Sequence, residues 1–320
     1  MKKAIIAQET PKQTSHSAVV YAGVWFAVIA WGTSFVAARY LLHPAATGLV
    51  ALSPTLLAAV RFSIASLFFI IPLARALMQR QISWRDLLRM ALLGQITFSL
   101  YFWLQYTGVQ QTNASISSIL VVGLIPVVTA IFAQFIGKEQ LRWANMLALL
   151  LGFGGVVIIV FQKPLAVTLA SGFLFGALCL VGNAFAFAAY STLSKRWMTK
   201  ISPLVMTGGT MLSGAVGLVL LSLLDPAGNN WGAIVRLDNV QWFALLFLSL
   251  ICSVLAYFAY NTALTRIPAA KAAVYIYFEP VVAVLLGVTL LGEPLNWQVI
   301  VGAGAIAASI AAVTLTKQGK

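Results

Sequence analysis

The chain has 320 residues, of which 61% are hydrophobic and only 8% are charged. An average soluble domain has about 25% charged residues, so this composition excludes an ordinary water-soluble fold and predicts an all-α polytopic membrane protein. The formal net charge is +13, but the basic residues are scattered over short segments between apolar runs, which argues against a nucleic-acid-binding domain.

Apolar runs of the length that crosses a bilayer recur along the whole chain. They are continuous rather than alternating, which favours helices over strands. We expect ten transmembrane helices, at residues 21–41, 55–76, 87–107, 114–135, 144–161, 172–193, 203–224, 240–261, 270–291 and 297–315. Residues 1–20 lack the apolar core and cleavage site of a signal peptide, so we expect them to form a cytoplasmic tail. We expect a second cytoplasmic tail at residues 316–320.

The basic residues predict the orientation of the chain in the membrane. With the N-terminus inside, 16 of the 20 Lys and Arg residues fall in cytoplasmic segments, and only Lys163 and Arg236 fall in outer loops. The other two, Arg39 and Arg61, lie within spans. Cytoplasmic loops are enriched in Lys and Arg. Both termini are therefore predicted to be cytoplasmic. This agrees with an even number of helices, which places the two termini on the same side of the membrane.

The two halves of the chain repeat each other. A shift of 154 residues aligns Tyr106 with Tyr260 and Pro126 with Pro280. We divide the chain into a first five-helix repeat at 21–161 and a second at 172–315. Because five is odd, the second repeat is expected to have the inverted orientation, which is typical of secondary transporters that work by alternating access.

Several stretches resemble a known group of transporters. "AWGTSFVAAR" in the first helix, "RFSIASLFFI" in the second, and "GKEQLRW" and "LGEPLNWQVIVGAGAIAASI" in the two halves are similar to the drug/metabolite transporter superfamily, specifically its EamA-type bacterial metabolite exporters. The resemblance implies five plus five helices, location in the bacterial inner membrane, and secondary transport, with export of amino acids among the common activities.

A single carboxylate stands out in the ninth predicted helix. Glu279 lies at least nine residues, roughly 13 Å at 1.5 Å per residue, from each end of this span. An ionised carboxylate facing lipid there costs at least about 2.5 to 3.5 kcal/mol, so we expect it to face the interior of the bundle. Two interpretations remain open: Glu279 attracts a substrate ammonium or titrates as a proton site, or it forms a structural ion pair with Arg61.

Other groups near mid-depth complete the candidate site. Amides and phenols need partners in a dry interior, and a solvated cavity would supply them. Tyr275 and Glu279 are spaced by four, which predicts one helix face. Pro126 and Pro280 occupy equivalent positions and are predicted to kink both helices as a pivot. The candidate substrate-binding residues are Trp31, Ser34, Tyr101, Asn183, Tyr257, Tyr275 and Glu279.

The sequence shows no motif for catalysis. It has no Gly-rich phosphate loop with a Lys, so direct use of ATP is not expected, and it has no His, Cys and Asp cluster for a metal. We therefore expect no enzyme activity and no cofactor, with an amino acid as the small-molecule substrate and the lipid bilayer as the surroundings. An organic-cation exporter is the main alternative and a membrane-embedded enzyme a distant one. Proton coupling, substrate identity and oligomeric state are left open.

Overall fold

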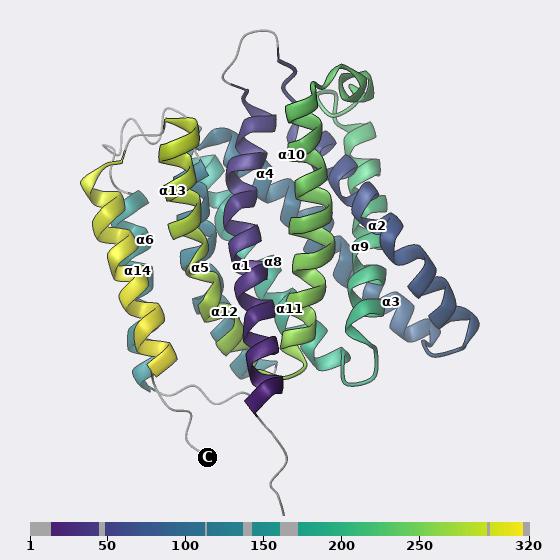
Figure 1. Ribbon diagram of the computed structural model, residues 1–320, viewed down its shortest axis with the longest axis horizontal. Coiled ribbons are helices and arrows are strands. Elements are labelled where there is room, and N and C mark those ends of the chain that lie inside the picture. The colour runs from purple at the N-terminus through teal and green to yellow at the C-terminus, as the bar shows by residue number, and fades with distance from the viewer. Residues whose placement is uncertain are drawn as a thin grey trace, which may run out of the picture.

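Every regular element in the described part of the chain is helical. The computed structural model describes residues 14–44, 49–112, 114–136, 143–160, 172–292 and 295–315. Figure 1 shows the helices side by side in one bundle. In chain order the elements are α1 (Thr14–Leu42), α2 (Pro54–Met78), α3 (Trp84–Gly94), the π-helix η1 (Gln95–Leu100), α4 (Tyr101–Gln111), α5 (Ala114–Phe135), α6 (Trp143–Val160), α8 (Phe173–Trp197), α9 (Pro203–Leu224), the 3₁₀-helix η2 (Trp231–Arg236), α10 (Asn239–Ser249), the π-helix η3 (Leu250–Leu255), α11 (Ala256–Leu264), α12 (Ala269–Ile276), α13 (Glu279–Leu291) and α14 (Trp297–Leu315).

The protein spans the membrane several times. Among the described residues, 7 helices or helical runs are long and apolar enough to cross a bilayer, and shorter apolar helices lie within α5, α6 and α14. The expected total of ten spans stays a prediction. Of the two predicted tails, residues 1–13 and 316–320 lie outside the described residues, and α1 begins at Thr14.

Equivalent helices of the two halves begin with the same chemistry. Ser53 before α2 and Ser202 before α9 each accept a hydrogen bond from a first-turn amide, and a proline follows each of them as the first helical residue. A serine oxygen satisfies an amide that has no partner within the helix, and proline there gives up no hydrogen bond. The repeat seen in the sequence is thus also a repeat of local structure.

The third helix of each half contains a π-helical turn at the same place. The run α3–η1–α4 starts with a capping box between Ser83 and Asp86, and the run α10–η3–α11 starts with one between Asp238 and Gln241. In both runs the α-helix then widens into six π-helical residues before it resumes. A π-helical turn is uncommon and often marks a functional region. Its occurrence at the equivalent place in both halves suggests that the functional site lies beside these turns, in the middle of the bundle.

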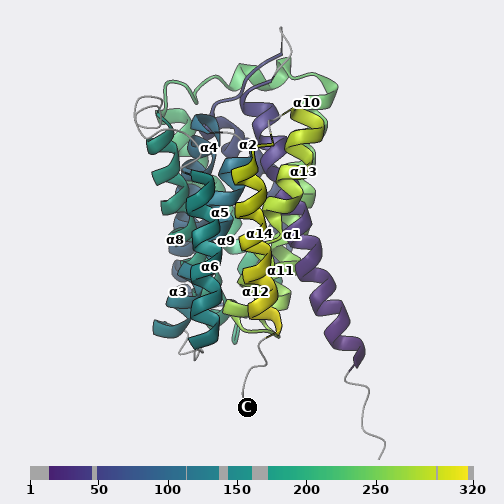
Figure 2. The ribbon, with the colours of Figure 1, turned by 90° about the vertical axis from the view of Figure 1, so that its left-hand side faces the viewer.

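The two halves interleave in space. α2 packs along α9, and α6 packs along α14, so that each of these helices lies beside its repeat equivalent. α1 packs on α11 and α13 of the second half, and α8 packs on α4 and α5 of the first. In Figures 1 and 2 the α6–α14 pair forms one side of the bundle, and the start of α1 and the end of α14 lie at the same end of it. The middle of the bundle is therefore built from both halves.

The ninth span is not the single helix that the sequence predicts. α12 ends at Ile276 and α13 begins at Glu279. In the turn between them, the Tyr277 amide donates to the Val274 carbonyl at 3.1 Å and the Phe278 amide to the Tyr275 carbonyl at 3.0 Å. These tighter bonds replace the α-helical pattern just ahead of Pro280, whose ring cannot continue it.

The equivalent proline behaves differently in the first half. α5 runs without interruption from Ala114 to Phe135, with Pro126 inside it. The shared proline alone therefore does not break a helix, and the break belongs to the second half.

The contact between α6 and α14 gives a test of this packing. A Cβ on Gly155 would lie 2.6 Å from the Gly302 carbonyl oxygen, whereas a Cβ on Gly154 would meet nothing within 4 Å. We expect Gly155→Ala to destabilise the protein by about 1 to 3 kcal/mol, because the helices must move apart. The neighbouring control Gly154→Ala should leave stability unchanged or raise it by up to about 1 kcal/mol. Thermal unfolding in detergent measures both, and equal effects would contradict the packing described here.

Candidate functional site

The break between α12 and α13 places Glu279 at the start of a helix inside the membrane. Glu279 is the first residue of α13 and is only 4% exposed. A helix start carries partial positive charge from its free amides, which favours a carboxylate there. α1 comes very close to this point at Gly32, where a Cβ would lie 2.7 Å from the Cβ of Val282 and 2.8 Å from the carbonyl oxygen of Glu279.

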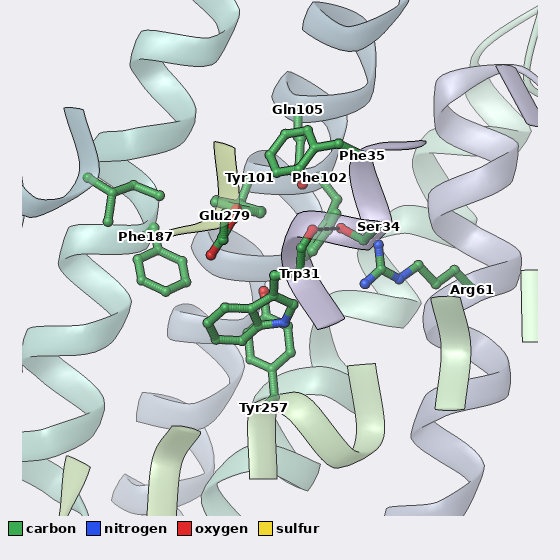
Figure 3. A pocket seen from close by; sticks show the side chains of 11 residues that line it. Trp31, Ser34, Phe35, Arg61, Tyr101, Phe102, Gln105, Phe187, Tyr257 and Glu279 are labelled. Atoms are coloured by element: carbon green, nitrogen blue, oxygen red, sulfur yellow. Dashed lines mark hydrogen bonds between the residues drawn. The ribbon is translucent and has the colours of Figure 1, made fainter. Parts of the chain in front are cut away.

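Glu279 faces a cavity in the middle of the bundle (Figure 3). Only about 20 Å³ of the cavity can hold the centre of a water molecule. Because one water needs roughly 10 to 15 Å³ by this measure, the cavity has room for one or two waters and not for an amino acid. Its lining residues are Trp31, Ser34, Phe35, Arg61, Tyr101, Phe102, Gln105, Ile125, Phe187, Tyr257 and Glu279.

A second charged residue, Arg61 of α2, lines the same cavity. Its side chain is 1% exposed. Its Nε donates to Ser253 Oγ at 2.8 Å and its Nη1 to Tyr106 Oη at 2.6 Å. The guanidinium also lies 4.9 Å from the ring centre of Phe102, a favourable cation–π contact. α2, α4 and η3 are joined through this one side chain.

The ion pair expected between Arg61 and Glu279 does not form directly in this conformation. Both residues are in the described part of the chain, and no guanidinium nitrogen of Arg61 lies within 4.0 Å of a carboxylate oxygen of Glu279. Figure 3 shows the two side chains reaching the cavity from different sides, with Trp31 and Ser34 between them. The cavity is thus lined by one acidic and one basic side chain that do not contact each other.

Aromatic rings form much of the cavity wall. The Trp31 ring centre lies 5.0 Å from that of Tyr257 and 5.8 Å from that of Phe187. Trp31 Nε1 also donates to the Cys252 carbonyl in η3 at 2.9 Å, and Cys252 Sγ donates to the Ala30 carbonyl at 3.1 Å. These two bonds fix α1 against the π-helical turn of the other half.

Asn183 of α8, in the second half, makes the equivalent contact with the first half. Its Nδ2 donates to the Tyr101 carbonyl, the first residue after η1, at 2.9 Å. Its Oδ1 is buried without a hydrogen-bond partner among the described residues. The first helix of each half is therefore bonded to the backbone beside the π-helical turn of the other half.

The structure brings together most of the residues that the sequence singles out. Trp31, Ser34, Tyr101, Tyr257 and Glu279 line the cavity. Asn183 lies behind Tyr101 and is absent from the lining.

Tyr275 lies apart from these residues. It packs in α12 against Tyr21 and Trp25 of α1, at ring distances of 5.9 and 5.4 Å. Because the helix breaks between Tyr275 and Glu279, their spacing of four does not place both at the cavity.

Sequence reasoning left several lining residues out of the site. Sequence predicts Arg61 only as an ion-pair partner, although any ionisable residue within a span is a functional candidate. Gln105 follows Tyr101 by four residues, a spacing that places both on one helix face, and both line the cavity. Ile125 is the repeat equivalent of Glu279, and both line the cavity. Phe35, Phe102 and Phe187 carry no sequence signal that separates them from ordinary core residues.

Comparison with known proteins identifies the group to which these features belong. The model of the EamA-like transporter family matches residues 19–161 and again residues 174–315. The chain belongs to the EamA-like transporter family. It is therefore a membrane transporter built from two copies of the family unit.

Curated relatives carry the same general description. An uncharacterised transporter of Archaeoglobus fulgidus is 25% identical over 276 residues, which is 86% of this chain and 91% of the relative. The uncharacterised inner membrane transporter YedA of Escherichia coli is 28% identical over 300 residues, 92% of this chain and 90% of YedA. A crystal structure at 22% identity superposes with a TM-score of 0.69 and covers 95% of this chain and 98% of its own, which shows the shared fold.

The bond from Trp31 to η3 predicts a measurable contribution to stability. Trp31→Phe keeps an aromatic ring but removes the buried indole hydrogen bond to the Cys252 carbonyl, so we expect a loss of about 1 to 3 kcal/mol. The matched control is Trp25→Phe in the same helix, where the side chain is 38% exposed and the change should stay within about 0.5 kcal/mol. Thermal unfolding compares the two variants. A larger loss for Trp25→Phe than for Trp31→Phe would be inconsistent with this bond.

Proposed function

We propose that this protein exports amino acids or related small metabolites across the bacterial inner membrane by alternating access. Ten spans, two inverted five-helix repeats and cytoplasmic termini complete the proposal. The observation that carries it is Glu279, a carboxylate at a helix break in a cavity between the two halves. Broken helices at mid-membrane form the substrate sites of many secondary transporters.

The connections of the bundle support the orientation. The start of α1, the α2–α3, α8–α9 and α11–α12 connections and the end of α14 lie at one end of the bundle in Figure 1. The basic residues on or beside these connections are Arg75, Arg80, Arg85, Arg89, Lys195, Arg196, Lys200, Arg266 and Lys271. An excess of Lys and Arg marks the cytoplasmic side.

The chemistry of the cavity suits an amino acid. Glu279 would receive the ammonium, and Ser34 and the phenols of Tyr101 and Tyr257 would offer further hydrogen bonds. The aromatic wall would accept varied apolar side chains. Asn183 and Tyr275 lie outside the lining in this conformation, so they would reach the substrate only after their helices move.

Transport requires such movement, because the cavity is too small for an amino acid in this conformation. The break between α12 and α13 supplies a place where α13 could tilt relative to α12. Pro126 in α5 would provide the matching, softer pivot in the first half, since proline removes one backbone hydrogen bond. The π-helical turns beside the cavity would allow smaller adjustments of α4 and α11.

An organic cation is the second candidate substrate. A buried carboxylate beside Trp31 and Tyr257 is the arrangement that favours a cation. Arg61 in the same cavity weighs against it, because a guanidinium repels a ligand whose only charge is positive. The amino acid is therefore preferred.

Transport by reconstituted protein tests the role of Glu279. We expect liposomes containing the native chain to take up labelled amino acids, and Glu279→Gln to lower the rate at least about tenfold, because a buried interaction with a charged group is worth roughly 1.5 to 3 kcal/mol. The control Asp225→Asn makes the same chemical change at the end of α9, where the carboxylate accepts from Thr55, and should retain transport.

An imposed pH gradient separates two mechanisms in the same assay. If Glu279 carries a proton against the substrate, the gradient accelerates native transport and has no effect on Glu279→Gln. If it only binds the ammonium, the gradient changes neither. Undiminished amino-acid transport by folded Glu279→Gln would remove Glu279 from the site.

A further inference from the structure

The central cavity is lined by two ionisable side chains of opposite type, one acidic and one basic, that do not contact each other. Arg61 and Glu279 both line it, are 1% and 4% exposed, and lie more than 4.0 Å apart at their charged atoms. Burying a charge without a close partner is costly. A ligand with complementary charges would stabilise the ionised forms of both side chains in this small space.

Arg61 has unused capacity to bind an anion. A guanidinium has five N–H donors in a planar fork, and in the described structure one donates to Ser253 and one to Tyr106. Both partners are neutral hydroxyls, and the rings of Phe62 and Phe102 lie 4.9 Å from the guanidinium, so no anionic group among the described residues pairs with it. The remaining donors match the two oxygens of a carboxylate, the geometry that arginine recognises best.

The cavity also offers hydrogen-bond acceptors. No described residue donates a hydrogen bond to the Glu279 carboxylate. Gln105 lines the same cavity at 5% exposure, and its Oε1 is buried without a hydrogen-bond partner among the described residues. An ammonium has three donors and no acceptor, so it matches groups that offer oxygen acceptors.

We propose that the cavity selects zwitterions, with Arg61 binding the substrate carboxylate and Glu279, assisted by Gln105, binding the ammonium. The proposal deepens the amino-acid transport proposed above and rests on it. It makes Arg61 a specificity-determining residue rather than a purely structural one. A ligand with only one charge leaves one buried protein charge unpaired, so the site rejects amines and carboxylic acids of the same size.

The native protein alone can test this selectivity. In the liposome assay, the amino acid that is transported fastest serves as the labelled substrate. Its methyl ester, which keeps the ammonium, and its N-acetyl derivative, which keeps the carboxylate, serve as competitors. We expect each to inhibit uptake at least about tenfold more weakly than the unlabelled amino acid, because each loses one charged partner. Equal competition by either derivative would overturn the proposal.

Variants assign the carboxylate to Arg61. We expect Arg61→Gln to abolish the preference for the free acid over the methyl ester, and Arg61→Lys to keep part of it. Tyr106→Phe and Ser253→Ala each remove one hydroxyl that holds Arg61 while keeping its charge, and both should keep the preference. Loss of the preference in these two controls as well would mean that Arg61 acts only through packing.

The two proposals fail in different ways. If no amino acid enters the liposomes, amino-acid transport is wrong and zwitterion selection falls with it. If amino acids enter but the ester competes as well as the acid, transport stands and the role of Arg61 is wrong. Should Arg61→Gln fail to fold, competition in the native protein still decides.

Discussion

The hydrocarbon core of a bilayer offers no hydrogen bonds, and this constraint decides how the polar groups of the chain are arranged. Backbone groups are satisfied within helices, and several buried polar side chains bond from one helix to another. Trp31 donates to the backbone of η3, Asn183 to the backbone beside η1, and Arg61 to hydroxyls on α4 and η3. The same few bonds that satisfy these groups therefore also fix the helices around the cavity.

Interleaving of the two halves follows from the repeat. α1 packs on α11 and α13, while α8 packs on α4 and α5, so the core of each half is completed by the other. A site between the halves then contains residues from equivalent positions. Ile125 and Glu279 are such a pair, and both line the cavity. The repeated fold places both residues at the cavity. Because one is isoleucine and the other glutamate, only the second half contributes a carboxyl group at this position.

Departures from regular helix surround the cavity. Tyr101 directly follows η1, Tyr257 is the second residue after η3, and Glu279 begins α13 after the break. All three line the cavity. A π-helical turn or a break shifts the side chains that follow it relative to a regular helix, which here directs two phenols and a carboxylate toward one point. Pro126 lies inside a continuous helix, whereas Pro280 lies beside the break. The largest departure from regular helix is therefore in the second half.

Apolar length and the internal repeat were sufficient to predict a helical membrane transporter, because both depend on composition and spacing along the chain. The same reasoning placed Trp31, Ser34, Tyr101, Tyr257 and Glu279 at mid-depth, since depth follows from position within a span. Tyr275 and Arg61 show the limit. The spacing of four between Tyr275 and Glu279 predicts a shared face only in a continuous helix, and the turn at Tyr277 interrupts that helix. The neighbours of Arg61 depend on how α2 packs against helices that are distant in sequence. Sequence alone determined which polar groups must face the interior of the bundle. Only the packing of helices from both halves decided which of these groups share a cavity. The physical reason is that hydrogen bonds and close contacts between separate helices leave no periodic pattern in the chain.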